Sequence, residues 1–94
     1  MTPRPKHTRR DLNHAEVRDG CREFGMIVWD LADLGSEVLD LLCCWRGACV
    51  PVEVKSPGGK LTEDQEKSIA ALLAVGVTPI IAETAQDVVN QWPR

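Results

Sequence analysis

The chain has 94 residues, 44% of them hydrophobic and 27% charged, and a formal net charge of −3. This composition is that of one folded domain and excludes a disordered chain, and no apolar stretch is long enough to cross a bilayer. A domain of this size has a small core, which association with a second copy commonly supplements. No charged start followed by an apolar block resembles a signal peptide, so the expected location is the cytosol.

The charge is unevenly distributed. The first ten residues contain four basic side chains and no acidic one, whereas all 14 acidic residues follow them. We expect residues 1–10 to form a flexible basic arm and residues 11–94 a single domain. Such an arm is compatible with contact to DNA phosphates, although many basic tails have no such role.

The first predicted element is a helix over about 13–24. Asn13 and Glu16 have the spacing of a capping box at its start, and apolar residues follow at helical spacing. Gly25 is the expected stop.

Three predicted strands follow, at about 26–31, 38–45 and 48–55, with a loop around Gly35 before the second. They are short runs rich in β-branched and aromatic residues. Pro51 cannot donate to a strand ladder, so it indicates an edge, an irregularity or a misplaced boundary.

The second half of the chain predicts a helix, a strand and a last helix. Thr62 and Gln65 form a second capping box, opening a helix over about 63–75. Three of its apolar side chains are expected to face inward: Ile69, Leu72 and Leu73. A strand over about 77–82 and a short helix capped by Thr84 complete an α-β-β-β-α-β-α order, which predicts an α/β fold around a mixed sheet.

The four cysteines are Cys21, Cys43, Cys44 and Cys49. We expect buried free thiols, because no export signal supports an oxidising compartment. The spacing offers no C-x-x-C pair, so a metal knuckle is the less favoured alternative, along with incidental surface thiols.

Charged residues interrupt the second and third predicted strands. Glu53 and Lys55 are two residues apart and share one face of their strand, and Asp40 breaks the apolar run of the neighbouring one. Burying unpaired charge is costly, and a divalent cation shared by Asp40 and Glu53 would offset that cost. Mg²⁺ prefers such oxygen ligands and activates water for phosphodiester hydrolysis, while Lys55 can orient that water or offset transition-state charge. The alternative is a structural ion-pair network, in which Asp40 or Glu53 pairs with Lys55.

These residues belong to a longer pattern that resembles the virus-type replication-repair nuclease (VRR-NUC) domain of the PD-(D/E)XK superfamily. The resemblance covers about residues 11–92, with Leu39 where the family usually has proline. Free-standing members of this size occur in phages and prophages. The matching segments are Asn13-His14-Ala15-Glu16, Gly35-x4-Asp40-Leu41-Leu42, Val52-Glu53-Val54-Lys55 and Lys60-Leu61-Thr62-x-x-Gln65.

The resemblance implies a restriction-endonuclease-like α-β-β-β-α-β core, with a mixed four-stranded sheet flanked by helices. It also implies Mg²⁺-dependent DNA hydrolysis, with Mn²⁺ as a substitute. The implied metal ligands are Asp40, Glu53, the main-chain oxygen of Val54 and, often through water, Glu16. Lys55 matches the catalytic lysine and Gln65 a glutamine near the site. Small members look like dimeric Holliday-junction resolvases.

Other residues keep two interpretations. A capping role alone explains Glu16 and Gln65. Lys60 and Arg46 are candidates for phosphate contact, but surface solubility residues are commoner. Asp30 and Asp33 are favoured as solvated loop charges, and Trp29 and Trp45 as packing residues rather than base-stacking ones.

The favoured function is a homodimeric, metal-dependent endonuclease acting on branched or structured DNA. The first alternative is a catalytically idle nucleic-acid-binding or assembly module with a nuclease fold. A nuclease for restriction or packaging, acting on ordinary duplex, is a weaker third.

Overall fold

A computed structural model describes residues 9–35 and 37–94 of the protein. The predicted element order is confirmed, with one short 3-10 helix added. Arg9 and Arg10 belong to the first helix, and the rest of the predicted basic arm lies outside the described residues. Within the described ranges, no helix combines the length and apolar character needed to span a membrane.

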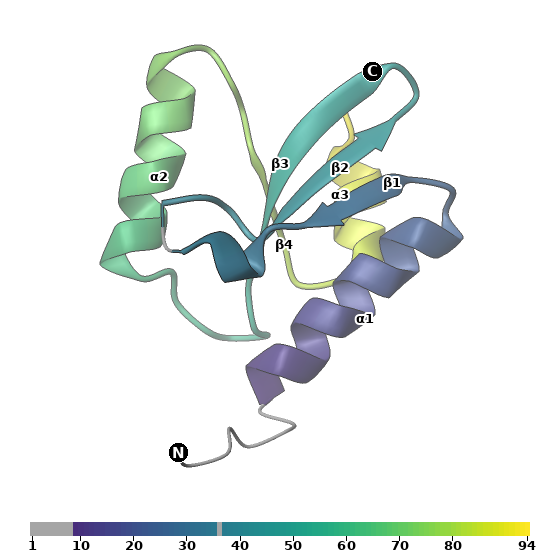
Figure 1. The fold of residues 1–94 in the computed structure, drawn as a ribbon, viewed down its shortest axis with the longest axis horizontal. Helices are drawn as coiled ribbons and strands as arrows, with labels where there is room; N and C mark the ends of the chain where they lie inside the picture. The colour runs from purple at the N-terminus through teal and green to yellow at the C-terminus, as the bar shows by residue number, and fades with distance from the viewer. Residues whose placement is uncertain (1–8, 36) are drawn as a thin grey trace.

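The elements are α1 (Arg9–Glu23), β1 (Ile27–Asp30), η1 (Ala32–Leu34), β2 (Leu41–Trp45), β3 (Ala48–Val54), α2 (Glu63–Ala74), β4 (Ile80–Ala82) and α3 (Ala85–Gln91) (Figure 1).

The four strands form one mixed sheet in the order β1-β2-β3-β4. β1, β2 and β3 are antiparallel neighbours, and β4 runs parallel to β3. β3 lies between β2 and β4, but β4 pairs only with its residues Val52, Glu53 and Val54. At Pro51 the side of β3 that faces β4 is therefore unpaired, and the missing N–H of proline costs no ladder bond there.

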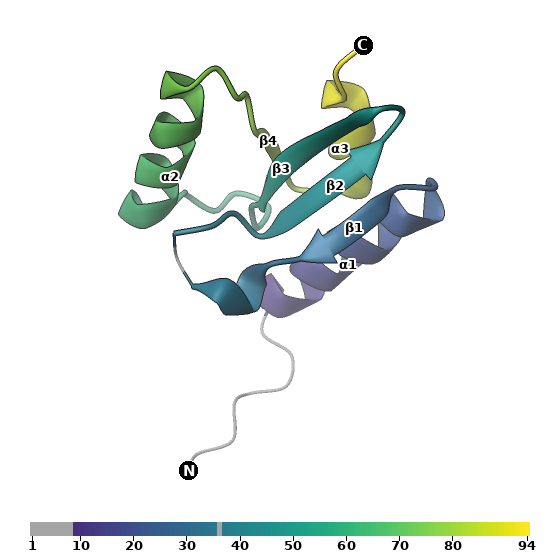
Figure 2. The same ribbon diagram turned by 45° about the horizontal axis from the view of Figure 1, so that its top comes forward.

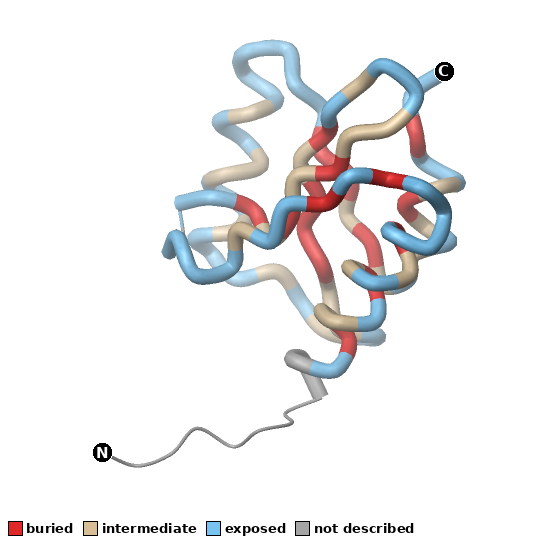
Figure 3. The backbone as a smooth tube through the Cα atoms, turned by 45° about the vertical axis from the view of Figure 1, so that its right-hand side comes forward, coloured by how far each residue is buried: buried red, intermediate tan, exposed pale blue. Residues whose placement is uncertain are grey.

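The core lies between the sheet and the two helices α1 and α3, which cover the same face (Figure 2). Val17 of α1, Val52 of β3 and Val88 of α3 are fully buried there, and buried positions gather where these elements meet (Figure 3). α1 approaches α3 closely at Gly20, because a Cβ at this position would lie 2.6 Å from the Cβ of Ala85.

The opposite face of the sheet has little cover. Ile27 and Trp29 alternate with the buried Val28 and are 63% and 60% exposed. α2 stands apart from the sheet (Figures 1 and 2) and has no buried residue. The prediction that three of its apolar side chains face inward holds only in part: Ile69 and Leu72 are half-buried, whereas Leu73 is 53% exposed, because no other described element packs extensively against this helix.

Two of the three predicted caps are confirmed. Thr62 and Gln65 form the capping box of α2, and Thr84 forms another with Asp87 at the start of α3. The predicted cap at Asn13 is wrong, since α1 begins four residues earlier, at Arg9.

The prediction of free thiols holds for two cysteines and is wrong for the other two. Cys21 and Cys43 are buried and free. Cys44 and Cys49 form a disulfide, because the register of β2 and β3 places them directly opposite each other, with Cα atoms 4.0 Å apart. The spacing of five residues along the chain hides this pairing, which depends on the position of the hairpin turn.

Candidate active site

Two acidic residues from neighbouring strands reach one cavity. Asp40 directly precedes β2, where its carbonyl oxygen accepts a hydrogen bond of 2.8 Å from the main-chain N–H of Leu31. Glu53 lies in β3 on the face opposite the helices and is only 1% exposed. Both line a cavity of about 430 Å³, together with residues of the η1–β2 loop and the start of α2. The structure thus brings together two residues that are 13 positions apart in the sequence.

Hydrogen bonds hold both carboxylates. Oδ2 of Asp40 accepts from the main-chain N–H of Val54 at 2.8 Å. Oε1 of Glu53 accepts from Nε2 of Gln65 at 2.5 Å, and Oε1 of Gln65 accepts from the N–H of Thr62 at 2.7 Å. Gln65 therefore caps α2, as predicted, and also contacts Glu53; its role in the candidate site stays a prediction.

Lys55 lies beside this cavity rather than inside it. Its Nζ is 3.2 Å from Oε1 of Glu83, so its ion pair differs from the one with Asp40 or Glu53 that the structural alternative predicts. Lys55 and Lys60 line an adjoining pocket of about 110 Å³, and Gln65 lines both spaces.

Helix α1 carries Glu16 and also brings Asn13 to the end of β3. Glu16 is exposed and lines neither space; its predicted cap is not found, because α1 begins at Arg9, and its role at the metal stays a prediction. Asn13 is 9% exposed, and its Nδ2 donates a hydrogen bond of 2.9 Å to the carbonyl oxygen of Lys55. Sequence reasoning missed this role because it treated Asn13 as a helix cap.

Glu83 was also missed. β4 pairs with β3 in parallel, and the last paired positions are Val54 and Ala82. The N–H of Lys55 donates to the carbonyl of Ala82 at 2.8 Å, so the next pair on the ladder is Lys55 with Glu83. A charge opposite the lysine of a predicted E-x-K strand is the only sequence signal for Glu83, and finding it requires the correct register.

The donor set determines which ion the cavity fits. Within residues 9–35 and 37–94, no three His, Cys, Asp or Glu side chains converge closely enough to hold a metal ion. Asp40 and Glu53 provide two carboxylates, which suits Mg²⁺, since this ion keeps several waters and needs only one or two carboxylates. They do not fit a structural zinc site, which takes four protein ligands.

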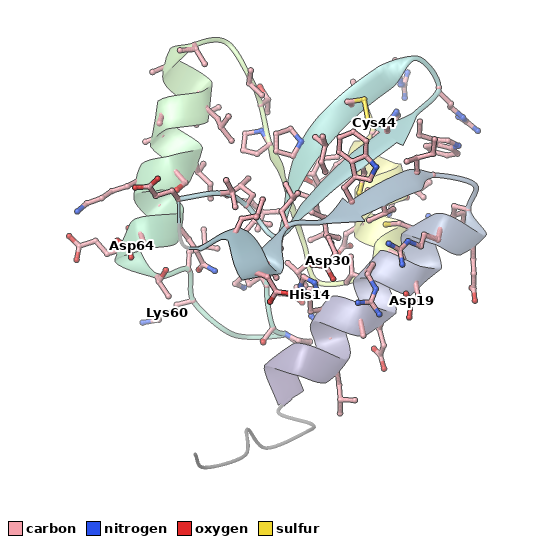
Figure 4. The ribbon with its side chains drawn as sticks, viewed as in Figure 1. His14, Asp19, Asp30, Cys44, Lys60 and Asp64 are labelled. Carbon is pink, nitrogen blue, oxygen red and sulfur yellow. A yellow bond between two sulfur atoms is a disulfide. The ribbon has the colours of Figure 1, made fainter. Side chains whose placement is uncertain are left out.

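A second charged cluster joins α1 to the end of β1, outside the cavity. Asp30 accepts from Arg18 and contacts His14, each at 3.0 Å (Figure 4). Burial opposes its ionisation, but hydrogen bonds from the N–H of Ala32, from Arg18 and from His14 outweigh this effect and lower the pKa of Asp30. The side-chain bond from Arg18 likewise lowers the pKa of Asp19. Asp30 is therefore an ion-pair partner of α1 at the end of β1, and it remains exposed to solvent.

The remaining candidates lie apart from the carboxylates or at their margin. The guanidinium of Arg46 lies 4.1 Å from the ring centroid of Trp45, which packs edge-to-face on Trp92. Trp45 is thus the predicted packing residue, whereas Trp29 is exposed. Lys60 and Asp64 lie near the N-terminal end of α2 (Figure 4). Asp33 is exposed in η1.

Neither known protein families nor curated proteins give a match to this sequence. A solved structure described as a VRR_NUC domain does match the fold. The TM-score is 0.73 at 18% identity, and the match covers 93% of this chain and 100% of the other. The chain therefore has the fold that the resemblance predicts, a mixed four-stranded sheet with helices in the VRR-NUC arrangement.

Proposed function

We propose that this domain with a VRR-NUC fold is a metal-dependent DNA endonuclease that hydrolyses phosphodiester bonds. The observation that carries the proposal is the shared cavity of Asp40 and Glu53, with Lys55 at its border. A module that only binds DNA gains nothing from placing the carboxylates of Asp40 and Glu53 in one cavity, because both repel DNA phosphates.

The proposed site has distinct roles for its residues. Asp40, Glu53 and the carbonyl oxygen of Val54 would hold Mg²⁺, with Mn²⁺ as a substitute. The bound cation supplies activation of water and polarisation of the phosphoryl oxygen. Gln65 fixes the orientation of the Glu53 carboxylate through its hydrogen bond. Lys55 provides a cation next to the scissile phosphate, where charge develops in the transition state.

We further propose a homodimer that acts on branched DNA such as four-way junctions. The exposed apolar surface supports association, since Ile27 and Trp29 on the sheet and Leu73 and Val75 at the end of α2 are all more than half exposed. Exposed apolar side chains on the sheet and on α2 give two places where a second copy could bind. Two sites related by a two-fold axis would place one active site on each of two opposing strands.

Cleavage assays test the chemistry first. Labelled four-way junction, flap and linear duplex are incubated with the protein in Mg²⁺, in Mn²⁺ and in EDTA, beside the Lys55→Ala variant. We expect metal-dependent cleavage, strongest on the junction, and a loss of about 100-fold or more in the variant. DNA binding without cleavage in either metal would identify the idle module instead, and equal cleavage of junction and linear duplex would refute the branched substrate.

Light scattering coupled to gel filtration tests the dimer. Wild type is expected to have twice the monomer mass at micromolar concentration, and Trp29→Arg to have the monomer mass. A wild-type monomer with full junction cleavage would overturn the paired-site proposal.

A further inference from the structure

We infer that Glu83 is a positioning residue that keeps the ammonium of Lys55 away from the carboxylates of the site. This inference rests on the proposed function, because it assigns a role at the same site. Its basis is the Lys55–Glu83 ion pair, which joins the ends of β3 and β4 at 3.2 Å.

The main chain holds both partners in place. The N–H of Lys55 donates to Ala82 at 2.8 Å, and its carbonyl accepts from the buried Asn13 at 2.9 Å. The N–H of Glu83 donates to Oδ2 of Asp87 at 2.9 Å, and the same oxygen accepts from Thr84 in the capping box of α3. The freedom left at this position is therefore that of the side chains.

A lysine side chain uses that freedom readily. Its charge sits on a flexible four-carbon stem, so it turns toward whichever carboxylate is available. Glu53 lies two residues before Lys55 on the same face of β3, about 7 Å away along the strand. Without Glu83, strand geometry offers Glu53 as the alternative partner, and a lysine bound there competes with a cation for the same oxygen atoms.

Glu83 has the properties that this role requires. Its side chain is 39% exposed and that of Lys55 is 27% exposed, so the pair is partly shielded yet open to exchange when DNA arrives. Glu83 lines neither the carboxylate cavity nor the adjoining pocket, so it does not act as a ligand. Its effect is thus expected to pass entirely through Lys55.

The test is a double-mutant cycle read by metal binding. Mg²⁺ affinity is measured by calorimetry for wild type, Glu83→Ala, Lys55→Ala and the double variant, with Asp19→Asn as a control for the loss of one negative charge. We expect Glu83→Ala to weaken binding about threefold or more, as for an ion pair of this exposure. In the Lys55→Ala background the same change should have no effect. An equal loss in both backgrounds would show that Glu83 acts by direct electrostatic attraction of the cation and would overturn the inference, as would an unchanged affinity in Glu83→Ala.

A second readout needs neither metal nor cleavage. Nuclear Overhauser contacts of the Lys55 ε-methylene group are recorded in the metal-free protein. They are expected to move from residue 83 in wild type to Glu53 in Glu83→Ala, and to stay at residue 83 in Glu83→Gln, whose amide oxygen still accepts. A lysine that keeps its place in Glu83→Ala contradicts the inference. If wild type binds no Mg²⁺ or Mn²⁺, the proposed function fails, and these contacts alone decide the role of Glu83.

Discussion

Replacing Glu53 by glutamine is expected to make the metal-free protein more stable. Glu53 is 1% exposed and shares its cavity with Asp40. Burying an ionised carboxylate costs several kcal/mol, and the carboxylate of Asp40 in the same cavity adds like-charge repulsion when no cation is bound. A glutamine has nearly the same volume, carries no charge and still accepts from Gln65.

The expected gain in the free energy of unfolding is about 1 kcal/mol in EDTA. For a domain of this length that corresponds to a rise in Tm of about 4–8 °C. In Mg²⁺ the wild type should become more stable than Glu53→Gln. A ligand at 100 times its Kd stabilises the folded state by about 2.7 kcal/mol, and only the wild type keeps both carboxylates to bind it.

Thermal unfolding followed by circular dichroism, in EDTA and in a series of Mg²⁺ concentrations, measures both effects. Glu23→Gln, the same chemical change at an exposed position of α1, serves as a comparison. A Glu53→Gln variant that is less stable than wild type by 2 kcal/mol or more in EDTA would show that Glu53 is a structural partner. A wild-type Tm that does not respond to Mg²⁺ or Mn²⁺ would refute the metal-site reasoning.

Three further predictions concern stability. Gly20→Ala should lower the free energy of unfolding by about 1–3 kcal/mol, because the new methyl group would lie 2.6 Å from the Cβ of Ala85 and overlap it. Urea unfolding measures this loss. An unchanged midpoint would mean that α1 and α3 are further apart. Asp30→Asn should cost about 1 kcal/mol at pH 7. Because folding lowers the pKa of Asp30, its contribution to stability is present above its unfolded pKa of about 3.9 and is lost as pH falls through the folded value. The free energies of unfolding of wild type and Asp30→Asn should therefore converge in acid. A constant difference down to pH 2 would contradict this. Reducing the Cys44–Cys49 disulfide should cost at most about 2 kcal/mol, since it closes a short loop; titration of denatured, unreduced protein should find two free thiols, and four would show that the bond is absent.

The elements with local signals were predictable from the sequence. The Thr62–Gln65 and Thr84 caps are set by side chains three residues apart, and alternation alone places Glu53 and Lys55 on one face of a strand. The matched segments also predicted the VRR-NUC fold, and the fold comparison confirms it at 18% identity.

The partners of these residues were not predictable in the same way. Glu83 reaches Lys55 only because β4 pairs with β3 in one particular register, and Asn13 reaches it because α1 starts earlier than its apparent cap suggests. The exposed side of α2 was missed for a related reason: an apolar pattern shows which face a helix can bury but does not identify the surface that covers it.

The sequence by itself thus determined the element order, the capped helices and the acidic and basic groups of the candidate site. The tertiary structure decided which groups meet: Asp40 with Glu53 in one cavity, Lys55 with Glu83 beside it, and Cys44 with Cys49 across the hairpin. The physical reason is the range of the interactions. Caps and alternation depend on residues within one turn or one strand, whereas contacts between strands depend on register and packing, which are properties of the whole chain.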